Sequence, residues 1–383
     1  MSMMESILRL MAERHASDVY LSANSPVLIR IKGDCQPVNS KALPPDAPRA
    51  LLAEILPPKR MEELEETGEL NMAHSMAGVG RFRISGMRQR GSYAAVIRCI
   101  SFDIPKLETL MLPAGLADLM LQKRGLLLMV GATGAGKSTT LASLIDHRNE
   151  RMSGHILTLE DPIEFLFKNK KSVINQREIG TDTATLQTGL KNALRQAPDV
   201  IMIGEIRDRD TMSAAIAYAQ SGHLCLATMH ANNSYQALNR ILSFYPVEVR
   251  STLLGDLAAA LKAVISQRLL RTVAGGRAPA VEVMLNTKFV SELIERGDFS
   301  AVKEAMEKSM ADGSQTFEQD IARMITNGMV SREEGLANAD SPTNLMWKLE
   351  NRFTGNPGAP TAAPLDPVAS SNASSFGHIT LDT

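Results

Sequence analysis

Residues 126–139 read LLLMVGATGAGKST, and this stretch decides the fold. Its first five residues are apolar, which is typical of a strand buried on both faces of a sheet. The turn that follows fits the pattern G-x-x-x-x-G-K-[ST], and residues 137–148 have the pattern of the helix that this motif requires. Such a turn points backbone N–H groups and the positive end of the helix at a phosphate group. The stretch therefore predicts a phosphate-binding loop between a buried strand and a helix.

The chemistry of this loop points to ATP and Mg²⁺ as cofactors. Lys137 is expected to reach the β- and γ-phosphate oxygens, and Ser138 is expected to ligate Mg²⁺. The competing interpretation, a glycine turn between two core elements, does not explain the Gly-Lys-Ser sequence at this offset. The predicted nucleotide contacts are Gly131, Ala132, Thr133, Gly134, Ala135, Gly136, Lys137, Ser138 and Thr139.

Further apolar strands continue the pattern along the chain. Residues 155–159 and 200–203 are short and apolar and are separated by helical periodicity, which favours a mainly parallel sheet with helices on both faces. Residues 247–337 are predicted to be mostly helical, interrupted by one strand at 280–285, and to form a helical subdomain that closes the chain. The expected class is an α/β fold.

A carboxylate ends one of these strands. Residues 199–205 read DVIMIGE, the layout of a Walker B strand, and Glu205 stands at its carboxyl end, where open α/β sheets bind ligands. Glu205 is a candidate to orient or deprotonate the attacking water. The alternative is that Glu205 belongs to a solvated charge cluster with its neighbours Arg207, Asp208 and Arg209.

Acidic residues and histidines follow two more strands. Glu160 and Glu164 belong to the segment TLEDPIE and are expected at the same rim, where carboxylates can hold Mg²⁺ through water molecules. An ordinary turn is the alternative for Glu164. Residues 221–230 have the pattern of a buried strand bracketed by His223 and His230. His230 directly follows the strand, where a γ-phosphate sensor is expected, so a functional role is favoured for His230 and left open for His223.

The first hundred residues predict a separate α+β unit, with a hairpin at 26–38 and strands at 81–90 and 92–100. Strand alternation places Arg81 and Arg83 on one face of the sheet. Guanidinium groups suit phosphate, so these arginines are candidates to contact ATP held by a neighbouring copy. A solvated face, or a face that meets an acidic partner, is the alternative.

Prolines and composition divide the chain into four parts. We expect a first domain at 1–100, a linker at 101–112, an ATPase domain at 113–350 and a tail at 351–383. The tail is rich in Pro, Ala and Ser and nearly without charge, so it is expected to be disordered.

Charge, cysteines and hydropathy exclude several classes of protein. The formal net charge of -1 gives no whole-chain basic field for nucleic acid or anionic lipid. The three cysteines are too widely spaced for a disulfide framework or a four-cysteine zinc site. No apolar stretch approaches the ~20 residues of a transmembrane helix, and the N-terminus does not read as a signal peptide. A cytoplasmic protein is expected.

Four segments occur here in a distinctive order: GATGAGKST at 131–139, TLEDPIEF at 158–165, DVIMIGEIRD at 199–208 and GHLCLATMHANN at 222–233. With them the chain resembles, over residues 3–340, the type II/type IV secretion superfamily of hexameric ATPases, and within it the PilT/PilU pilus-retraction group. The resemblance implies a PAS-like N-terminal domain, a RecA-like P-loop ATPase domain, a homohexamer and ATP-driven retraction of a type IV pilus, known as twitching motility. It also implies a place at the inner-membrane pilus machine, through the platform protein.

The same resemblance implies roles for individual residues. Glu205 would be the general base, Glu160 and Glu164 would belong to the acidic box, and His223 and His230 to the histidine box. Arginines 81, 83 and 195 match arginines that look toward the nucleotide or the subunit boundary in such rings.

One segment departs from PilT-type motors. Residues 289–298, FVSELIERGD, lack the Ala-Ile-Arg start and the Gly-Lys end found there. With ISGMRQRG at 84–91 and LKNALRQAPDV at 190–200, this favours a PilU-like accessory motor that works with a paralogous PilT-type motor.

Three alternative functions follow from the same residues. A pilus-extension or type II secretion ATPase is disfavoured because a C-x-x-C pair and a long extra N-terminal region are absent. A nucleic-acid translocase on a RecA-like ring is disfavoured by the near-neutral charge, so no direct nucleic-acid partner is expected. A ring subunit that binds ATP without hydrolysing it would be recognised by its lack of turnover.

Overall fold

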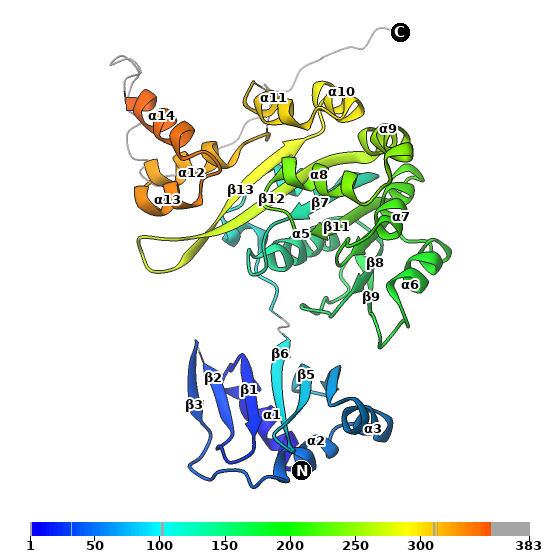
Figure 1. The fold of residues 1–383 in the computed structure, drawn as a ribbon, viewed down its shortest axis with the longest axis vertical. Helices are drawn as coiled ribbons and strands as arrows, with labels where there is room; N and C mark the ends of the chain where they lie inside the picture. The colour runs from blue at the N-terminus through cyan, green and yellow to red at the C-terminus, as the bar shows by residue number, and fades with distance from the viewer. Residues whose placement is uncertain (1, 32, 101–102, 309–310, 312, 354–383) are drawn as a thin grey trace, which may run out of the picture.

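The structure is a computed structural model that describes residues 2–31, 33–100, 103–308, 311 and 313–353. It has two sheets, one above the other in Figure 1, joined by the segment that follows residue 100. The tail was expected from residue 351, but the helix α14 (Pro342–Phe353) extends past that residue. Residues 354–383, the rest of the predicted disordered tail, lie outside the described residues.

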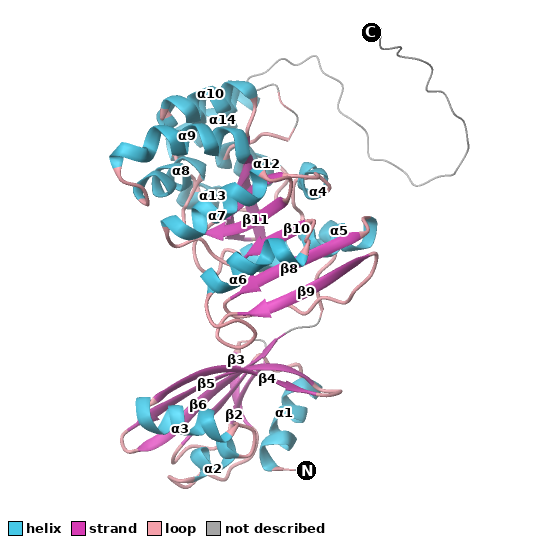
Figure 2. Cartoon of the chain, turned by 90° about the vertical axis from the view of Figure 1, so that its right-hand side faces the viewer, coloured by secondary structure: helices cyan, strands magenta, loops and turns pink. Residues whose placement is uncertain are grey.

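The N-terminal sheet is antiparallel throughout and has the order β3-β2-β1-β6-β5-β4. Three helices cover one of its faces (Figure 2). The first helix begins at a capping box between Ser2 and Glu5 and buries a stripe of apolar residues, Met4, Ile7, Leu8 and Met11. The elements are α1 (Met3–Glu13), β1 (Asp18–Ser22), β2 (Leu28–Ile31), β3 (Asp34–Pro37), α2 (Ala47–Ala53), α3 (Pro58–Thr67), β4 (Glu69–Met76), β5 (Gly80–Gln89) and β6 (Ser92–Ile100).

The second sheet has the order β13-β12-β7-β11-β10-β8-β9. Its strands run parallel except for β13, which pairs antiparallel with β12 at one edge. The strands are β7 (Gly125–Val130), β8 (Gly154–Glu160), β9 (Ser172–Glu178), β10 (Val200–Ile203), β11 (Leu224–Met229), β12 (Leu261–Arg271) and β13 (Arg277–Leu285). The predicted α/β class with a mainly parallel sheet is confirmed.

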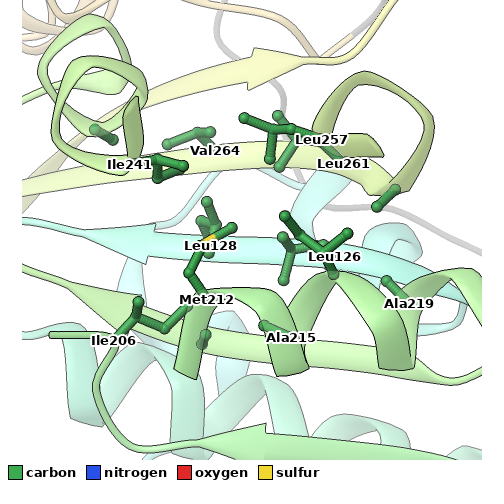
Figure 3. Close-up of a cluster of buried hydrophobic side chains, with 14 of the residues drawn as sticks. Leu126, Leu128, Ile206, Met212, Ala215, Ala219, Ile241, Leu257, Leu261 and Val264 are labelled. Carbon is green, nitrogen blue, oxygen red and sulfur yellow. The ribbon is translucent and has the colours of Figure 1, made fainter. Parts of the chain in front are cut away.

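Alternate residues of β7 face two different hydrophobic cores. Leu126 and Leu128 pack with helices α6 to α11, whereas Leu127 and Met129 pack with α4 and α5 on the opposite face. Figure 3 shows the first core, where side chains of β7, β12, α7 and α9 meet. The helices are α4 (Gly115–Met120), α5 (Lys137–Arg151), α6 (Leu186–Ala193), α7 (Arg209–Gln220), α8 (Ser234–Ser243), α9 (Arg250–Ala260), α10 (Lys288–Arg296) and α11 (Val302–Lys308).

The prediction for residues 247–337 was wrong in its central part. Residues 261–285 form the long hairpin β12–β13, and β12 lies beside β7 within the sheet. Apolar side chains at 261, 264, 265 and 269 also fit helical spacing, which explains the error. A helical unit does follow the hairpin within the described residues, in which α12 (Phe317–Thr326), α13 (Arg332–Asn338) and α14 (Pro342–Phe353) pack on its far end.

Sequence patterns also missed three strands, β1, β4 and β9. In β9, which reads SVINQRE, the buried residues include Ser172 and Glu178 while Val173 is exposed, so the strand gives a weak apolar signal. The predicted linker contains a short 3-10 helix, Leu107–Leu110, and the next helix begins at Gly115. Within the described part of the chain, no helix has both the length and the apolar character needed to cross a membrane.

Candidate nucleotide-binding and catalytic site

A cavity of about 530 Å³ lies at the carboxyl ends of the parallel strands. The start of α5, directly after the loop that follows β7, provides Lys137 and Ser138, and the ends of the neighbouring strands provide Glu160, Glu205 and His230. Parallel strands present their carboxyl ends at one edge of a sheet, which explains why residues far apart in the sequence meet here. The acidic-box residue Glu164 lines the same cavity and is exposed.

The phosphate-binding loop needs glycine at its last turn. Gly136 has φ +86°, and a Cβ there would lie 2.7 Å from the side-chain nitrogen of Gln267. Lys137 begins α5, and its Nζ donates hydrogen bonds to the carbonyl oxygens of Gly131 at 2.7 Å and Ala132 at 3.0 Å. Burial lowers the pKa of Lys137, while the carboxylates of Glu205 and Glu164 act in the opposite direction. An incoming phosphate would replace the two carbonyl oxygens as the partner of this ammonium group.

Gln267, which sequence reasoning missed, supports the loop from below. Its side chain is 2% exposed on β12, where its Nε2 donates to the carbonyl of Ala135 at 2.7 Å. Its Oε1 accepts a hydrogen bond from Thr140 Oγ1 at 2.8 Å. No local signal could have found Gln267, because β12 itself was predicted as helix.

Glu205 is held between two cationic or potentially cationic groups. Its Oε1 lies 3.2 Å from His230 Nε2, and its Oε2 lies 2.6 Å from Arg207 Nη2. The preceding Gly204 passes so close to β8 that a Cβ would lie 3.0 Å from the carbonyl oxygen of Leu159. Glu205 does form a charge cluster with Arg207, as the alternative interpretation held, but this cluster lines the cavity.

Glu160 is the more deeply buried carboxylate of the acidic box. Its Oε1 accepts hydrogen bonds from Thr158 Oγ1 at 2.6 Å and Gln176 Nε2 at 3.1 Å. Burial raises the pKa of Glu160 in spite of these donors. A carboxylate without a counter-ion in such surroundings would be stabilised by a cation, and Ser138 lines the same cavity. The residues present therefore fit a hydrated Mg²⁺ ion.

Two residues implied by the resemblance lie elsewhere. His223 precedes β11 and His230 follows it, so roughly 23 Å of strand separates them at ~3.3 Å per residue. His223 is near Ser221 and the carbonyl of Tyr218, at the opposite end of the strand from the cavity. Arg195 is exposed in a 3-10 helix and does not line the cavity.

Arg81 and Arg83 lie on the same face of β5, as alternation predicted, since the residues between and beside them are buried. Arg81 pairs with Glu178 of β9, with 3.0 Å between Nη2 and Oε2. Arg83 has no ion pair among the residues that the structure describes. Neither arginine lines the cavity of its own chain.

The fold and the site together define a P-loop ATPase. The model of the family "Type II/IV secretion system protein" matches residues 66–276, so the chain belongs to this family. The type IV pilus ATPase PilU of Pseudomonas aeruginosa is 44% identical, with 90% of this chain and 91% of that protein covered. The retraction ATPase PilT of the same organism is 35% identical, with 88% and 98% covered.

Solved structures agree with these relatives. The pilus retraction motor PilT with bound ADP superposes with a TM-score of 0.84, at 36% identity, covering 91% of this chain and 99% of that one. The ATPase DotB of Legionella pneumophila superposes with a TM-score of 0.76, at 26% identity, covering 87% and 93%. The family predicted from the four motifs is confirmed.

Proposed function

We propose that this protein is an ATPase that drives the retraction of type IV pili. The observation that carries the proposal is the position of Glu205, which lies between His230 and Arg207 in the cavity that also contains Lys137. This arrangement provides a cation that can bind phosphate and a carboxylate that can orient a water molecule and accept its proton. The likeness to PilU and PilT over most of the chain supports pilus retraction as the purpose of the hydrolysis.

Each residue of the cavity has a role in this proposal. The glycines of the loop direct backbone N–H groups to the phosphates, and Lys137 neutralises the β- and γ-phosphate oxygens. Ser138 and, through water, Glu160 would hold Mg²⁺, which supplies charge neutralisation at the phosphates when bound. Glu205 takes the proton of the attacking water, and His230 and Arg207 keep its carboxylate in place.

The assembly and the location of the protein are further parts of the proposal. We infer a homohexamer whose PAS-like domain, at 1–100, and RecA-like domain, at 113–350, move against each other around the linker at 101–112. Arg81 and Arg83 would then complete the site of a neighbouring subunit. The ring would act in the cytoplasm on the platform protein of the inner-membrane pilus machine, as an accessory to a PilT-type motor. The 44% identity to the type IV pilus ATPase PilU supports the assignment to a pilus motor.

Two experiments test the proposal. The purified protein should hydrolyse ATP in the presence of Mg²⁺, and the turnover should be absent without it. A deletion strain should carry excess pili that fail to retract and should twitch less than the wild-type strain. Bald cells would instead assign the protein to pilus extension, and normal pili with normal twitching would refute the proposal.

A further inference from the structure

The loop that follows β11 is held by hydrogen bonds at three successive residues, 232–234. Arg268 Nη2 donates to the carbonyl of Asn232 at 3.1 Å. Asn233 Nδ2 donates to Asp340 Oδ2 at 2.7 Å. The backbone N–H of residue 234 donates to the buried carboxylate of Glu282 at 2.8 Å. These anchors come from β12, from the α13–α14 loop and from β13, so three distant segments hold one short loop.

Arg268 and Asp340 form the centre of this arrangement. The guanidinium of Arg268 pairs with Asp340 Oδ1 and also donates to the carbonyl of Asn338. Both side chains are 20% exposed, and the guanidinium lies 4.0 Å from the ring centroid of Phe317. The two oxygens of Asp340 thus have different partners, Arg268 on β12 and Asn233 at the start of α8. We call these two residues the Arg268–Asp340 clamp.

The clamped loop begins at a catalytic group. His230 is the first residue after β11, and the helix α8 begins four residues later at Ser234. Asn233 is the N-cap of α8, with its Oδ1 accepting from the N–H of Gln236 at 2.9 Å. The strand fixes one end of this connection and the clamp fixes the other, so His230 has little freedom to leave Glu205.

We propose that Arg268 and Asp340 are positioning residues for hydrolysis, and that the segment joining α13 to α14 is thereby a part of the catalytic apparatus. This inference rests on the proposed ATPase function. Neither residue of the clamp lines the nucleotide cavity, and the clamp acts through residues 232–234 on the contact between His230 and Glu205. A displacement of ~1 Å at a catalytic group can lower the rate ~10²-fold, so loss of the clamp should be seen in kcat.

The substitution Asn233→Asp tests the clamp without removing the helix cap. Aspartate is as good an N-cap as asparagine, so α8 should still form. The new carboxylate would face that of Asp340, and the like charges would separate the loop from the clamp. We expect kcat to fall ~10-fold or more, since His230 is displaced, while KM for ATP changes less than ~2-fold because the phosphate-binding loop is untouched.

A second substitution in the same chain should restore the rate. With Asp340→Asn added, the side chain at 340 keeps an oxygen toward Arg268 and turns its NH₂ group to the carboxylate at 233. The hydrogen bond of the wild-type protein is then rebuilt with donor and acceptor exchanged. Recovery of kcat to within ~3-fold of wild type supports the clamp, because a nonspecific defect would add rather than cancel.

A control variant breaks a contact between α11 and α14 that does not involve residues 232–234. Glu307 on α11 accepts from Asn344 Nδ2 at 3.0 Å and lies 3.5 Å from Lys348 Nζ on α14. Glu307→Gln should leave kcat unchanged. Normal turnover of the Asn233→Asp protein, or no recovery in the folded double variant, would overturn the inference.

Hydrogen exchange separates this inference from the proposed function. Wild-type protein that does not hydrolyse ATP would refute the proposed function, whatever the variants do. In that case the clamp is still tested by the exchange rate of the amides at 231–236, which should rise in Asn233→Asp and return to the wild-type rate in the double variant. Unchanged exchange would refute the clamp itself.

Discussion

Arg81 Nη2 lies 3.0 Å from Glu178 Oε2, so an ion pair joins the N-terminal sheet to the seven-stranded sheet of the same chain. The two side chains are 17% and 5% exposed. The same carboxylate oxygen accepts a hydrogen bond from the backbone of Ile163, between the acidic residues of the cavity rim. Glu178 is also the register partner of Glu160 across β8 and β9. One arginine of the first sheet is thus linked to the loop that carries the acidic box.

Arg81 and Arg83 should be essential for turnover, whereas Glu178 should not be. Without the two guanidinium groups, the γ-phosphate of the ATP bound to a neighbouring subunit would lose a contact worth ~10³-fold in rate. We expect Arg81→Ala with Arg83→Ala to bind ATP but not to hydrolyse it. Glu178→Gln breaks the ion pair and leaves both arginines, so it should retain turnover.

Mixing experiments decide whether these arginines act between subunits. Excess Lys137→Ala protein should restore part of the activity of the double-arginine variant, because mixed rings contain junctions with both an intact loop and intact arginines. If mixing is shown by crosslinking and no activity returns, sharing is refuted. If Glu178→Gln is as inactive as the arginine variant, the ion pair itself is what hydrolysis needs.

Lys137→Ala should abolish ATP turnover, with a loss of more than ~10²-fold. The substitution removes the charge that meets the β- and γ-phosphates. Initial rates of phosphate release by the pure protein provide the measurement. Lys171→Ala is the control, because Lys171 is exposed and does not line the cavity, and it should hydrolyse ATP at the normal rate. A near-normal rate for Lys137→Ala would contradict the assignment of the loop.

Glu205→Gln should bind ATP and fail to hydrolyse it. Glutamine keeps the shape and one acceptor oxygen but not the basicity, so we expect a rate loss of ~10²- to 10⁴-fold. Binding of a fluorescent ATP analogue should change little. Parallel losses of binding and turnover would show instead that Glu205 shapes the cavity through Arg207 and His230.

Gln267→Ala should destabilise the protein and weaken nucleotide binding. The substitution leaves Thr140 and the carbonyl of Ala135 without their partners in a buried place, at a cost of about 1–3 kcal/mol. Denaturant unfolding measures the first effect and KM for ATP the second. Gln36→Ala, at an exposed position of β3, should change neither. An unchanged KM in Gln267→Ala would mean that the loop holds its shape without this support.

The stability of Glu282→Gln relative to wild type should increase as the pH rises. Burial raises the pKa of Glu282 above its ordinary value of 4.5, although residues 234 and 266 donate to it. The folded state therefore binds the proton more tightly than the unfolded state. Protonated Glu282 thus stabilises the wild-type protein at low pH, and this stabilisation is lost as the pH rises above about 4.5. Glutamine keeps an acceptor oxygen without this loss.

Melting temperatures between pH 4.5 and 7 provide the measurement for Glu282. The difference between Glu282→Gln and wild type should grow with pH. Glu304→Gln should show the opposite trend and lose stability relative to wild type as the pH rises, because Lys308 holds the pKa of the exposed Glu304 below its usual value. A constant difference for Glu282→Gln across this range would show that the pKa of Glu282 is the same in the folded and the unfolded protein.

Local sequence pattern alone determined the nucleotide-binding cavity of this protein. The buried run at 126–130, the glycine turn and Lys137 specify a strand, a loop and a helix from contacts within fourteen residues. The apolar strand before Glu205 and the strand before His230 could be read in the same way, and the parallel rule placed their ends at one edge. The cavity residues were therefore predictable as soon as the sheet was recognised.

Tertiary structure decided which residues pack against the cavity and hold it in place. The apolar spacing of residues 261–271 fits a helix as well as a strand, and the choice depends on pairing with β7 more than a hundred residues away. That pairing places Gln267 under the phosphate-binding loop and Arg268 beside Asp340. The contact of Arg81 with Glu178 likewise joins residues 97 apart in sequence. Sequence periodicity reports which face of an element is buried, but the partner of that face is selected by long-range packing, and this packing positions both the loop and the clamp.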